Sequence, residues 1–165
     1  MKTLLLMRHA KSSWKDDGLT DFERPLNNRG KRDTPFMGKL LREQKVQPDL
    51  IISSPALRAM TTARMIAAEL KYEQSNIITH EMLYNADVNA MMRIVEQVDN
   101  SLKTIILVGH NPGLTLLANV LSDASVENIP TCGIACIQFQ IDSWQAITRG
   151  AGTLAFFEKP KKYFR

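Results

Sequence analysis

The chain has 165 residues, of which 44% are hydrophobic and 23% charged, and it carries a formal net charge of +4 at pH 7. This length and composition indicate one ordinary globular domain spanning residues 1–165. The positive charge favours anionic partners, but it is too small and too scattered to indicate a protein that binds nucleic acid.

The first residues faintly resemble a secretory signal. The apolar segment that follows Lys2 ends at Arg8, too early for a signal peptide, and no small-residue cleavage site follows it. No segment approaches the roughly 18 apolar residues of a membrane span. We therefore expect a cytoplasmic protein that does not engage a membrane.

The cysteines and histidines do not form a recognisable metal or disulfide pattern. Cys132 and Cys136 lack C-x-x-C spacing, and we expect both to be buried on a strand. His9, His80 and His110 lack H-E-x-x-H spacing, and the chain has no GxGxxG or GxxxxGK[ST] loop. The sequence therefore predicts neither a metal nor a nucleotide cofactor.

The first predicted element is a strand over residues 3–7, whose apolar run fits a strand buried on both faces of a parallel sheet. The run stops at Arg8-His9. An arginine beside an imidazole at a strand end suggests a phosphate site with a nucleophile or general base. The alternative is that this dipeptide only marks where the strand meets solvent.

Residues 11–26 are predicted to form a loop, and a helix is expected from Asn28 to Arg42. Pro35 leaves two alternatives for this helix. Either the proline kinks it, or the regular part begins at Thr34.

A second buried strand is expected at residues 49–54. Pro55 is then expected in the first turn of a helix that extends to Leu70. Arg58 would lie in that first turn, close to the end of the strand. Alternatively, Arg58 is a solvated helix residue or part of a surface ion pair.

The next segment is predicted to contain a short strand at residues 76–79, a loop at 80–87 and a helix at 88–98. A third buried strand at residues 104–109 ends directly before His110.

The C-terminal third should begin with a helix ending near Leu121, with Asn111 as its N-cap and Pro112 as its first residue. The remaining expected elements are a half-exposed strand at 134–141, a last strand at 154–157 and a solvated basic tail at 159–165.

Three apolar strands, each followed by a helical pattern, predict βαβ units and a parallel sheet. The carboxyl ends of parallel strands meet at one edge, so Arg8, His9, Arg58 and His110 should converge there. The N-termini of the helices that follow the second and third strands would add N–H donors for an anion. The pattern therefore predicts a phosphate-binding site at this edge.

The residues at these three strand ends resemble the histidine phosphatase (phosphoglycerate mutase-like) superfamily. They are Arg8-His9-Ala10, Ser54-Pro55 with Arg58, and Gly109-His110. A wider set resembles the short SixA-like branch of phosphohistidine phosphatases, namely Arg8 to Ser12, Arg24-Pro25-Leu26 with Arg29-Gly30, and Val108 to Gly113. The resemblance implies a three-layer α/β/α sandwich with a mostly parallel central sheet.

The chain departs from the family pattern in three ways. Ala10 replaces the usual glycine of Arg-His-Gly, and Asn111 stands where the acid-phosphatase branch has an aspartate. Only about thirty residues separate Leu70 from Ser101, where larger members insert helices over the site. We therefore expect an open site.

The resemblance implies that His9 attacks phosphorus and becomes phosphohistidine, while Arg8, Arg58 and His110 bind the phosphoryl oxygens. To attack, His9 must be neutral, with its other nitrogen donating to a backbone carbonyl. Nearby arginines would disfavour the imidazolium. No metal or other cofactor is implied.

The proton donor to the leaving group is the least defined part of the site. Glu81 is the candidate, and Asp87 and Asp16 are alternatives. Since an imidazole can leave without a strong acid, the expected substrate is phosphohistidine on a protein. The alternatives are a small-molecule phosphomonoesterase of the same superfamily and a non-catalytic module that binds phosphoproteins. The sequence does not predict an oligomeric state.

Overall fold

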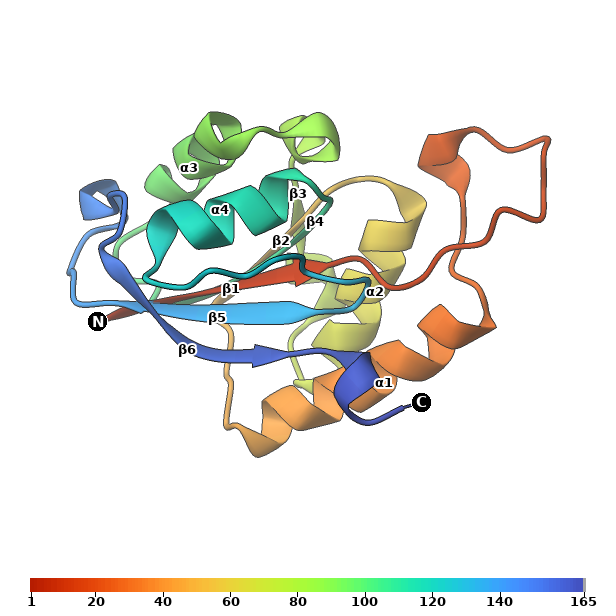
Figure 1. Ribbon diagram of the computed structural model, residues 1–165, viewed down its shortest axis with the longest axis horizontal. Coiled ribbons are helices and arrows are strands. Elements are labelled where there is room, and N and C mark those ends of the chain that lie inside the picture. The colour runs from red at the N-terminus through yellow and green to blue at the C-terminus, as the bar shows by residue number, and fades with distance from the viewer. Residues whose placement is uncertain (165) are drawn as a thin grey trace.

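The computed structural model describes residues 1–164, in which helices cover both faces of a six-stranded sheet (Figure 1). The strands are β1 (Lys2–Arg8), β2 (Leu50–Ser53), β3 (Ile78–Thr79), β4 (Thr104–Gly109), β5 (Ile134–Phe139) and β6 (Gly152–Glu158). The α-helices are α1 (Asn28–Glu43), α2 (Leu57–Glu69), α3 (Val88–Glu96) and α4 (Gly113–Leu121). Within these described residues, no helix has the length and apolar character needed to cross a membrane.

The sheet has the strand order β3-β2-β4-β1-β5-β6. Neighbours from β3 to β1 pair in parallel, whereas β5 pairs antiparallel with both β1 and β6. The predicted mostly parallel sheet is therefore confirmed. Its three central strands end at one edge, because Arg8 pairs with Gly109 and Ser53 pairs with Val108.

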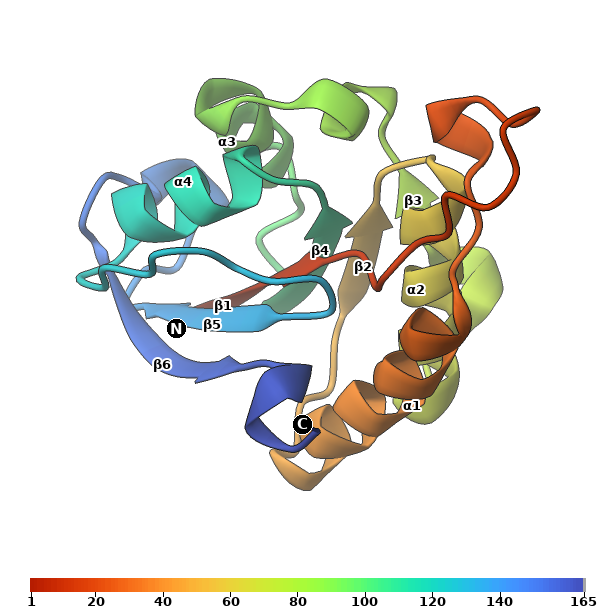
Figure 2. The same cartoon turned by 45° about the vertical axis from the view of Figure 1, so that its right-hand side comes forward.

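Alternate residues of the central strands face opposite helical layers, as the strand period of two requires. Leu4 and Leu6 pack with α3 and α4, whereas Leu5 and Met7 pack with α1 and α2. Figure 2 shows the two pairs of helices on opposite sides of the strands. The three-layer α/β/α sandwich expected from the sequence is confirmed, and β1 is buried on both faces.

The predicted starts of two helices were wrong by one or two residues. Pro55 precedes the N-cap Ala56 of α2, and Pro112 is itself the N-cap of α4. In both cases a polar side chain binds a backbone N–H of the first turn or its cap. Ser54 Oγ accepts from the N–H of Ala56, and Asn111 Oδ1 accepts from the N–H of Thr115.

The helix over residues 28–42 is confirmed as α1, with Pro35 in its interior. Its N-cap is Asn27, whose side chain accepts a hydrogen bond from the N–H of Gly30. The alternative that regular helix begins only at Thr34 is therefore wrong.

Two predictions about the C-terminal third need correction. The strand predicted to be half-exposed, β5, is buried along almost its whole length, because β1 and β6 flank it and both helical layers cover it. Cys132 and Cys136 are both buried, but only Cys136 lies on a strand. Cys132 has a left-handed backbone conformation (φ 63°) in the turn before β5, where its N–H donates to the carbonyls of Arg8 and His9.

The basic tail is less solvated than predicted. Pro160 is buried, and the Phe164 ring lies 4.8 Å from the Phe36 ring of α1, measured between centroids. The predicted tail also includes Arg165, which lies outside the described residues.

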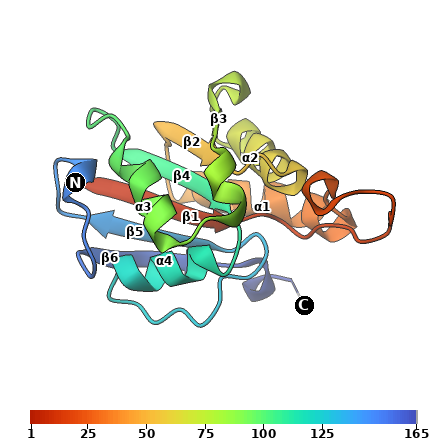
Figure 3. The same cartoon turned by 90° about the horizontal axis from the view of Figure 1, so that it is seen from above.

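A long loop follows β1 and extends beyond the carboxyl end of the sheet (Figures 1 and 3). Its two arms are joined, since the Ser13 N–H donates to Pro25 O and the Asn27 N–H donates to Lys11 O. The short 3-10 helix η1 (Asp21–Glu23) lies between these arms. The loop therefore returns to the end of β1, where it helps to build a pocket.

Candidate active site

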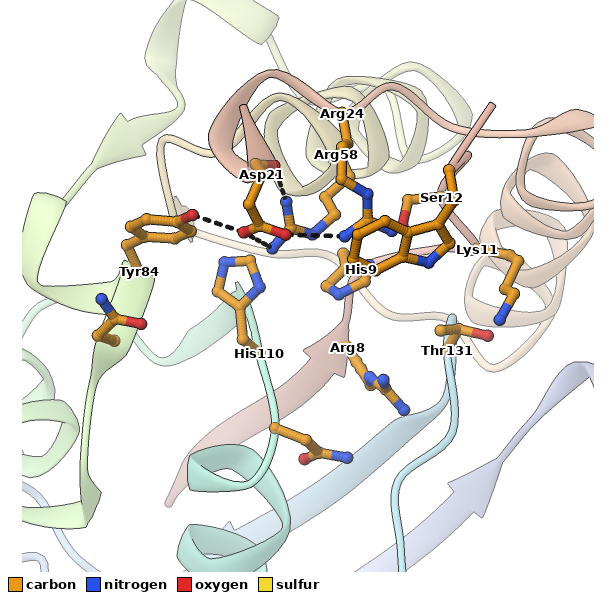
Figure 4. Close-up of a pocket in the computed structure, with 13 residues that line it drawn as sticks. Arg8, His9, Lys11, Ser12, Asp21, Arg24, Arg58, Tyr84, His110 and Thr131 are labelled. Atoms are coloured by element: carbon orange, nitrogen blue, oxygen red, sulfur yellow. Dashed lines mark hydrogen bonds and ion pairs between the residues drawn. The ribbon is translucent and has the colours of Figure 1, made fainter. Parts of the chain in front are cut away.

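A pocket of about 290 Å³ lies at the carboxyl ends of β1, β2 and β4 (Figure 4). We call it the strand-end pocket. Its lining residues are Arg8, His9, Lys11, Ser12, Trp14, Asp21, Arg24, Arg58, Tyr84, Asn85, His110, Asn111 and Thr131. The structure thus brings together the four residues that the sequence predicted to converge, namely Arg8, His9, Arg58 and His110.

The ring of His9 is held by its own chain at the end of β1. Nδ1 lies 2.8 Å from the carbonyl oxygen of Ala10, and the residue is only 7% exposed. A carbonyl oxygen can only accept, so Nδ1 carries the proton and Nε2 of the neutral ring keeps its lone pair. The Ala10 N–H in turn donates to Thr62 Oγ1 at 2.9 Å. These contacts fix both the tautomer and the position of the ring.

Burial lowers the pKa of His9 to about 3, and the positive charges of Arg58 and Arg8 act in the same direction. The hydrogen bond to Ala10 opposes this shift only in part. The sequence predicts only the effect of the arginines, whereas burial contributes more to the lowered pKa of His9. His9 is therefore a neutral imidazole at pH 7, the state that a nucleophile requires.

Arg58 projects from the first turn of α2 and is only 6% exposed. Its Nη1 donates to the backbone oxygen of Asp21 at 2.6 Å, and its Nη2 lies 3.0 Å from Asp21 Oδ2. Arg8 donates from Nη1 to Ile129 O at 3.3 Å. Among the described residues, the buried Nε atoms of Arg8 and Arg58 have no acceptor. Each guanidinium group therefore has an N–H donor that no described residue satisfies.

His110 follows β4 directly, and its ring packs beside that of His9 in the pocket, with 5.1 Å between the ring centroids. A hydrogen bond of 2.7 Å joins His110 Nε2 to Ser54 Oγ. Burial and the charge of Arg58 lower the pKa of His110 to about 4. The two histidines are therefore both neutral at pH 7.

Asp21 is the main lining residue that the sequence analysis missed. Its carboxylate accepts from Tyr84 Oη at 2.5 Å and from Arg24 Nη1 at 2.8 Å, in addition to its contact with Arg58. These three donors, Tyr84 first, hold the pKa of Asp21 well below its usual range. The one sequence signal was its position three residues before Arg24, a spacing that allows an ion pair.

The pocket as a whole is electropositive. Lys11, Arg8, Arg24 and Arg58 line it, and Asp21 is the one carboxylate among the lining residues of the described chain. With both histidines neutral, three positive charges are in excess. Such a surplus, with directed N–H donors, suits a phosphoryl dianion.

Glu81 is exposed at the start of the 3-10 helix η3 (Glu81–Asn85) and does not line the strand-end pocket, although Tyr84 and Asn85 of the same helix do. The two alternative acids have local structural contacts. Asp87 caps α3 by accepting from the Ala90 N–H, and Asp16 accepts from the Gly18 N–H. The role of Glu81 as a proton donor stays a prediction.

Known proteins match both the sequence and the fold. A model of the histidine phosphatase superfamily (branch 1) matches residues 4–96. An uncharacterized protein of Mycobacterium tuberculosis is 33% identical over 167 residues, covering 94% of this chain and 100% of that protein. The chain belongs to the histidine phosphatase superfamily.

The histidine phosphatase fold is also seen in solved structures. The putative phosphohistidine phosphatase SixA of Agrobacterium tumefaciens has a TM-score of 0.82 at 24% identity, covering 96% of this chain and 98% of that one. The protein histidine phosphatase SixA complexed with tungstate has a TM-score of 0.83 at 21% identity, covering 97% and 98%. These likenesses establish a SixA-like, phosphoglycerate mutase-like fold for this member of the superfamily.

Proposed function

We propose that this protein is a phosphohistidine phosphatase that acts on a phosphorylated protein, with His9 as its nucleophile. Membership of the histidine phosphatase superfamily supports phosphatase activity. The proposal for the substrate and the mechanism depends on the chemistry of the strand-end pocket.

In the proposed reaction, His9 Nε2 attacks phosphorus and forms a P–N bond, while the bond from phosphorus to the leaving nitrogen breaks. The leaving imidazole departs neutral if its far nitrogen was protonated beforehand. Water then attacks phosphorus and forms a P–O bond as the P–N bond to His9 Nε2 breaks. Inorganic phosphate leaves, and His9 is restored as the neutral ring. The Ala10 carbonyl stabilises the ring as positive charge develops during the first step.

Arg8 and Arg58 would bind the phosphoryl oxygens throughout transfer, since both are charged, line the pocket and have a donor without a protein acceptor among the described residues. His110 lies beside His9, and with Nε2 accepting from Ser54 Oγ, its Nδ1–H would donate one further hydrogen bond to the same group. Preorganised donors of this kind supply most of the catalysis in phosphoryl transfer. Because these side chains balance the phosphoryl charge, we propose that the reaction needs no metal, so activity should survive EDTA.

The observation that carries the choice of substrate is the state of Asp21. This carboxylate lines the pocket, but its hydrogen bonds from Tyr84, Arg24 and Arg58 keep it ionised at neutral pH. It therefore cannot donate a proton to an alkoxide, which is a poor leaving group without one. An imidazole that is already protonated needs no such donor. This difference favours phosphohistidine over an alkyl phosphate.

The test compares kcat/KM of one preparation on a phosphohistidine protein, a sugar phosphate and an aryl phosphate, with His9→Ala as the inactive control. We expect phosphohistidine to be the best substrate. Activity on the sugar phosphate with none on phosphohistidine would assign the protein to the small-molecule phosphatases. Binding without turnover of any substrate would indicate a phosphoprotein-binding module.

Glu81→Gln adds a second arm to this comparison. If Glu81 donates a proton to the leaving group, the substitution should slow alkyl phosphate hydrolysis by about 10²–10⁴-fold and phosphohistidine hydrolysis far less. If wild type and Glu81→Gln hydrolyse each of the two substrates at the same rate, Glu81 takes no part in the mechanism.

A further inference from the structure

Trp14 is 71% exposed although it is one of only two tryptophans in the chain, and it lines the strand-end pocket. The exposed surface of this large ring gains no free energy from burial, and it stands at the edge of an electropositive pocket. Trp144, by contrast, is fully buried.

The indole of Trp14 is nonetheless held in place. The guanidinium carbon of Arg24 lies 3.2 Å from the ring centroid, so Arg24 covers one face of the indole. Arg24 is itself only 8% exposed and donates to Ser12 Oγ, to Ser13 O and to Asp21 Oδ1. The ring thus rests on a fixed cation, while its high exposure leaves the other face open.

The position of the leaving group follows from the position of the nucleophile. His9 is buried at the base of the pocket, and phosphoryl transfer requires the leaving group to lie opposite the attacking nitrogen. The leaving group therefore projects toward the exposed rim. Trp14, Asp21 and Asn85 are the exposed lining residues, and Trp14 is the one that offers an aromatic face.

A second aromatic ring borders the same pocket. Tyr84 packs edge-on against His110, with 5.6 Å between centroids, and its hydroxyl is anchored on Asp21. Figure 4 shows Tyr84 and Lys11 on opposite sides of His9. A flat group leaving from His9 would thus pass the ring of Tyr84, whose hydroxyl donates to Asp21 Oδ2. The other carboxylate oxygen of Asp21 accepts from Arg24, which stacks on Trp14.

We propose that Trp14 is a specificity-determining residue, whose open indole face stacks on a planar leaving group such as the imidazole of phosphohistidine. This inference rests on the proposed function for the choice of imidazole, and on the pocket geometry for the preference for a flat ring. Stacking of two rings stabilises a complex enough to change affinity by about five- to tenfold.

The test uses two matched pairs of substrates, each with one planar and one non-planar leaving group. Phosphoimidazole is compared with phosphoramidate, and phenyl phosphate with ethyl phosphate. Trp14→Ala should lower kcat/KM about five- to tenfold on the planar member of each pair, mainly through KM, and less than twofold on the other member. Trp14→Phe should restore most of the loss. Tyr163→Ala, which removes an exposed aromatic ring outside the pocket, should leave kcat/KM unchanged on both planar and non-planar substrates.

The outcomes separate the two proposals. If the wild-type protein hydrolyses only phenyl and ethyl phosphate, the proposed function is refuted. The effect of Trp14→Ala on phenyl phosphate relative to ethyl phosphate would still test the role of Trp14. Equal losses on planar and non-planar substrates, or a selective loss in Tyr163→Ala, would overturn the role of Trp14. No change in Trp14→Ala on any substrate would overturn it as well.

Discussion

The guanidinium group of Arg58 is fixed by Asp21, a residue 37 positions earlier in the chain. Nη1 donates to the Asp21 backbone oxygen and Nη2 to its carboxylate, so the loop after β1 sets the orientation of an arginine on α2. The strand-end pocket therefore depends on this loop as much as on the sheet.

Arg58→Lys tests the directed donors of this arginine. Lysine keeps the charge but lacks the planar fork, so the contacts with Asp21 and with a phosphoryl group cannot both form. We expect a loss of roughly 2–4 kcal/mol in transition-state stabilisation, seen as lower kcat/KM. Arg64→Lys, on the exposed face of the same helix, is the control. An Arg58→Lys activity within threefold of wild type would place Arg58 outside the phosphate site.

Asp21→Asn should weaken the fold in a pH-dependent manner. The folded-state pKa of Asp21 is depressed, so its carboxylate stabilises the protein above its unfolded pKa of about 3.9. That contribution is lost as pH falls through this value toward the folded pKa. Because the side chain is half-exposed, we expect a difference of at most about 1 kcal/mol at pH 7.

Urea unfolding of wild type and Asp21→Asn at pH 7, 5 and 3 measures this difference. The gap between the two proteins should be largest at pH 7 and smallest at pH 3. Asp17→Asn, in the same exposed loop, should match wild type throughout. A gap that widens as pH falls would contradict the ionised state of Asp21.

The two histidines give a direct spectroscopic prediction. Their folded-state pKa values are lowered to about 3 for His9 and about 4 for His110. Long-range ¹H–¹⁵N spectra should therefore show both rings neutral from pH 8 down to about 5. The unfolded chain binds protons below about 6.5, so the contribution of these rings to stability falls as pH drops from 6.5 toward 4. A titration of His9 centred near 6.5 would contradict its burial.

Gly30→Ala tests how closely α1 approaches the chain after His9. A Cβ at this position would overlap the backbone carbonyl oxygen of Lys11, which cannot move without shifting the pocket. We expect a loss of roughly 1–3 kcal/mol in the free energy of unfolding, together with lower activity. At exposed Gly18 the added Cβ would meet only the Asp16 side chain, at 3.2 Å. If Gly18→Ala is as harmful as Gly30→Ala, this account of the approach is wrong.

The sheet and four of the pocket residues could be predicted because they follow local patterns. An apolar run that ends at His9 or His110 identifies a buried strand, and parallel strands bring their ends to one edge. The predicted N-terminal ends of α2 and α4 also lie within one or two residues of the observed ones. The difference arises because a proline fits both the first turn of a helix and the residues just before it.

Asp21, Trp14 and Tyr84 could not be predicted in the same way. They come from a loop and two short 3-10 helices, and their positions depend on contacts between distant residues. The carboxylate of Asp21 reaches Tyr84 across 63 positions of the chain, and no periodicity encodes such a contact. Backbone contacts within the long loop hold its shape, such as the antiparallel β-bridge between Ser12 and Leu26.

The central claim is that His9 carries the phosphoryl group during turnover. The most direct measurement mixes the protein with a ³²P-labelled phosphohistidine protein, quenches it in alkali and locates the label by mass spectrometry. His80→Ala serves as a matched histidine control. We predict a label on His9 that is stable to alkali and lost in acid, present in wild type and His80→Ala but absent from His9→Ala. A label that persists in His9→Ala, or that is found on another residue, would contradict the account.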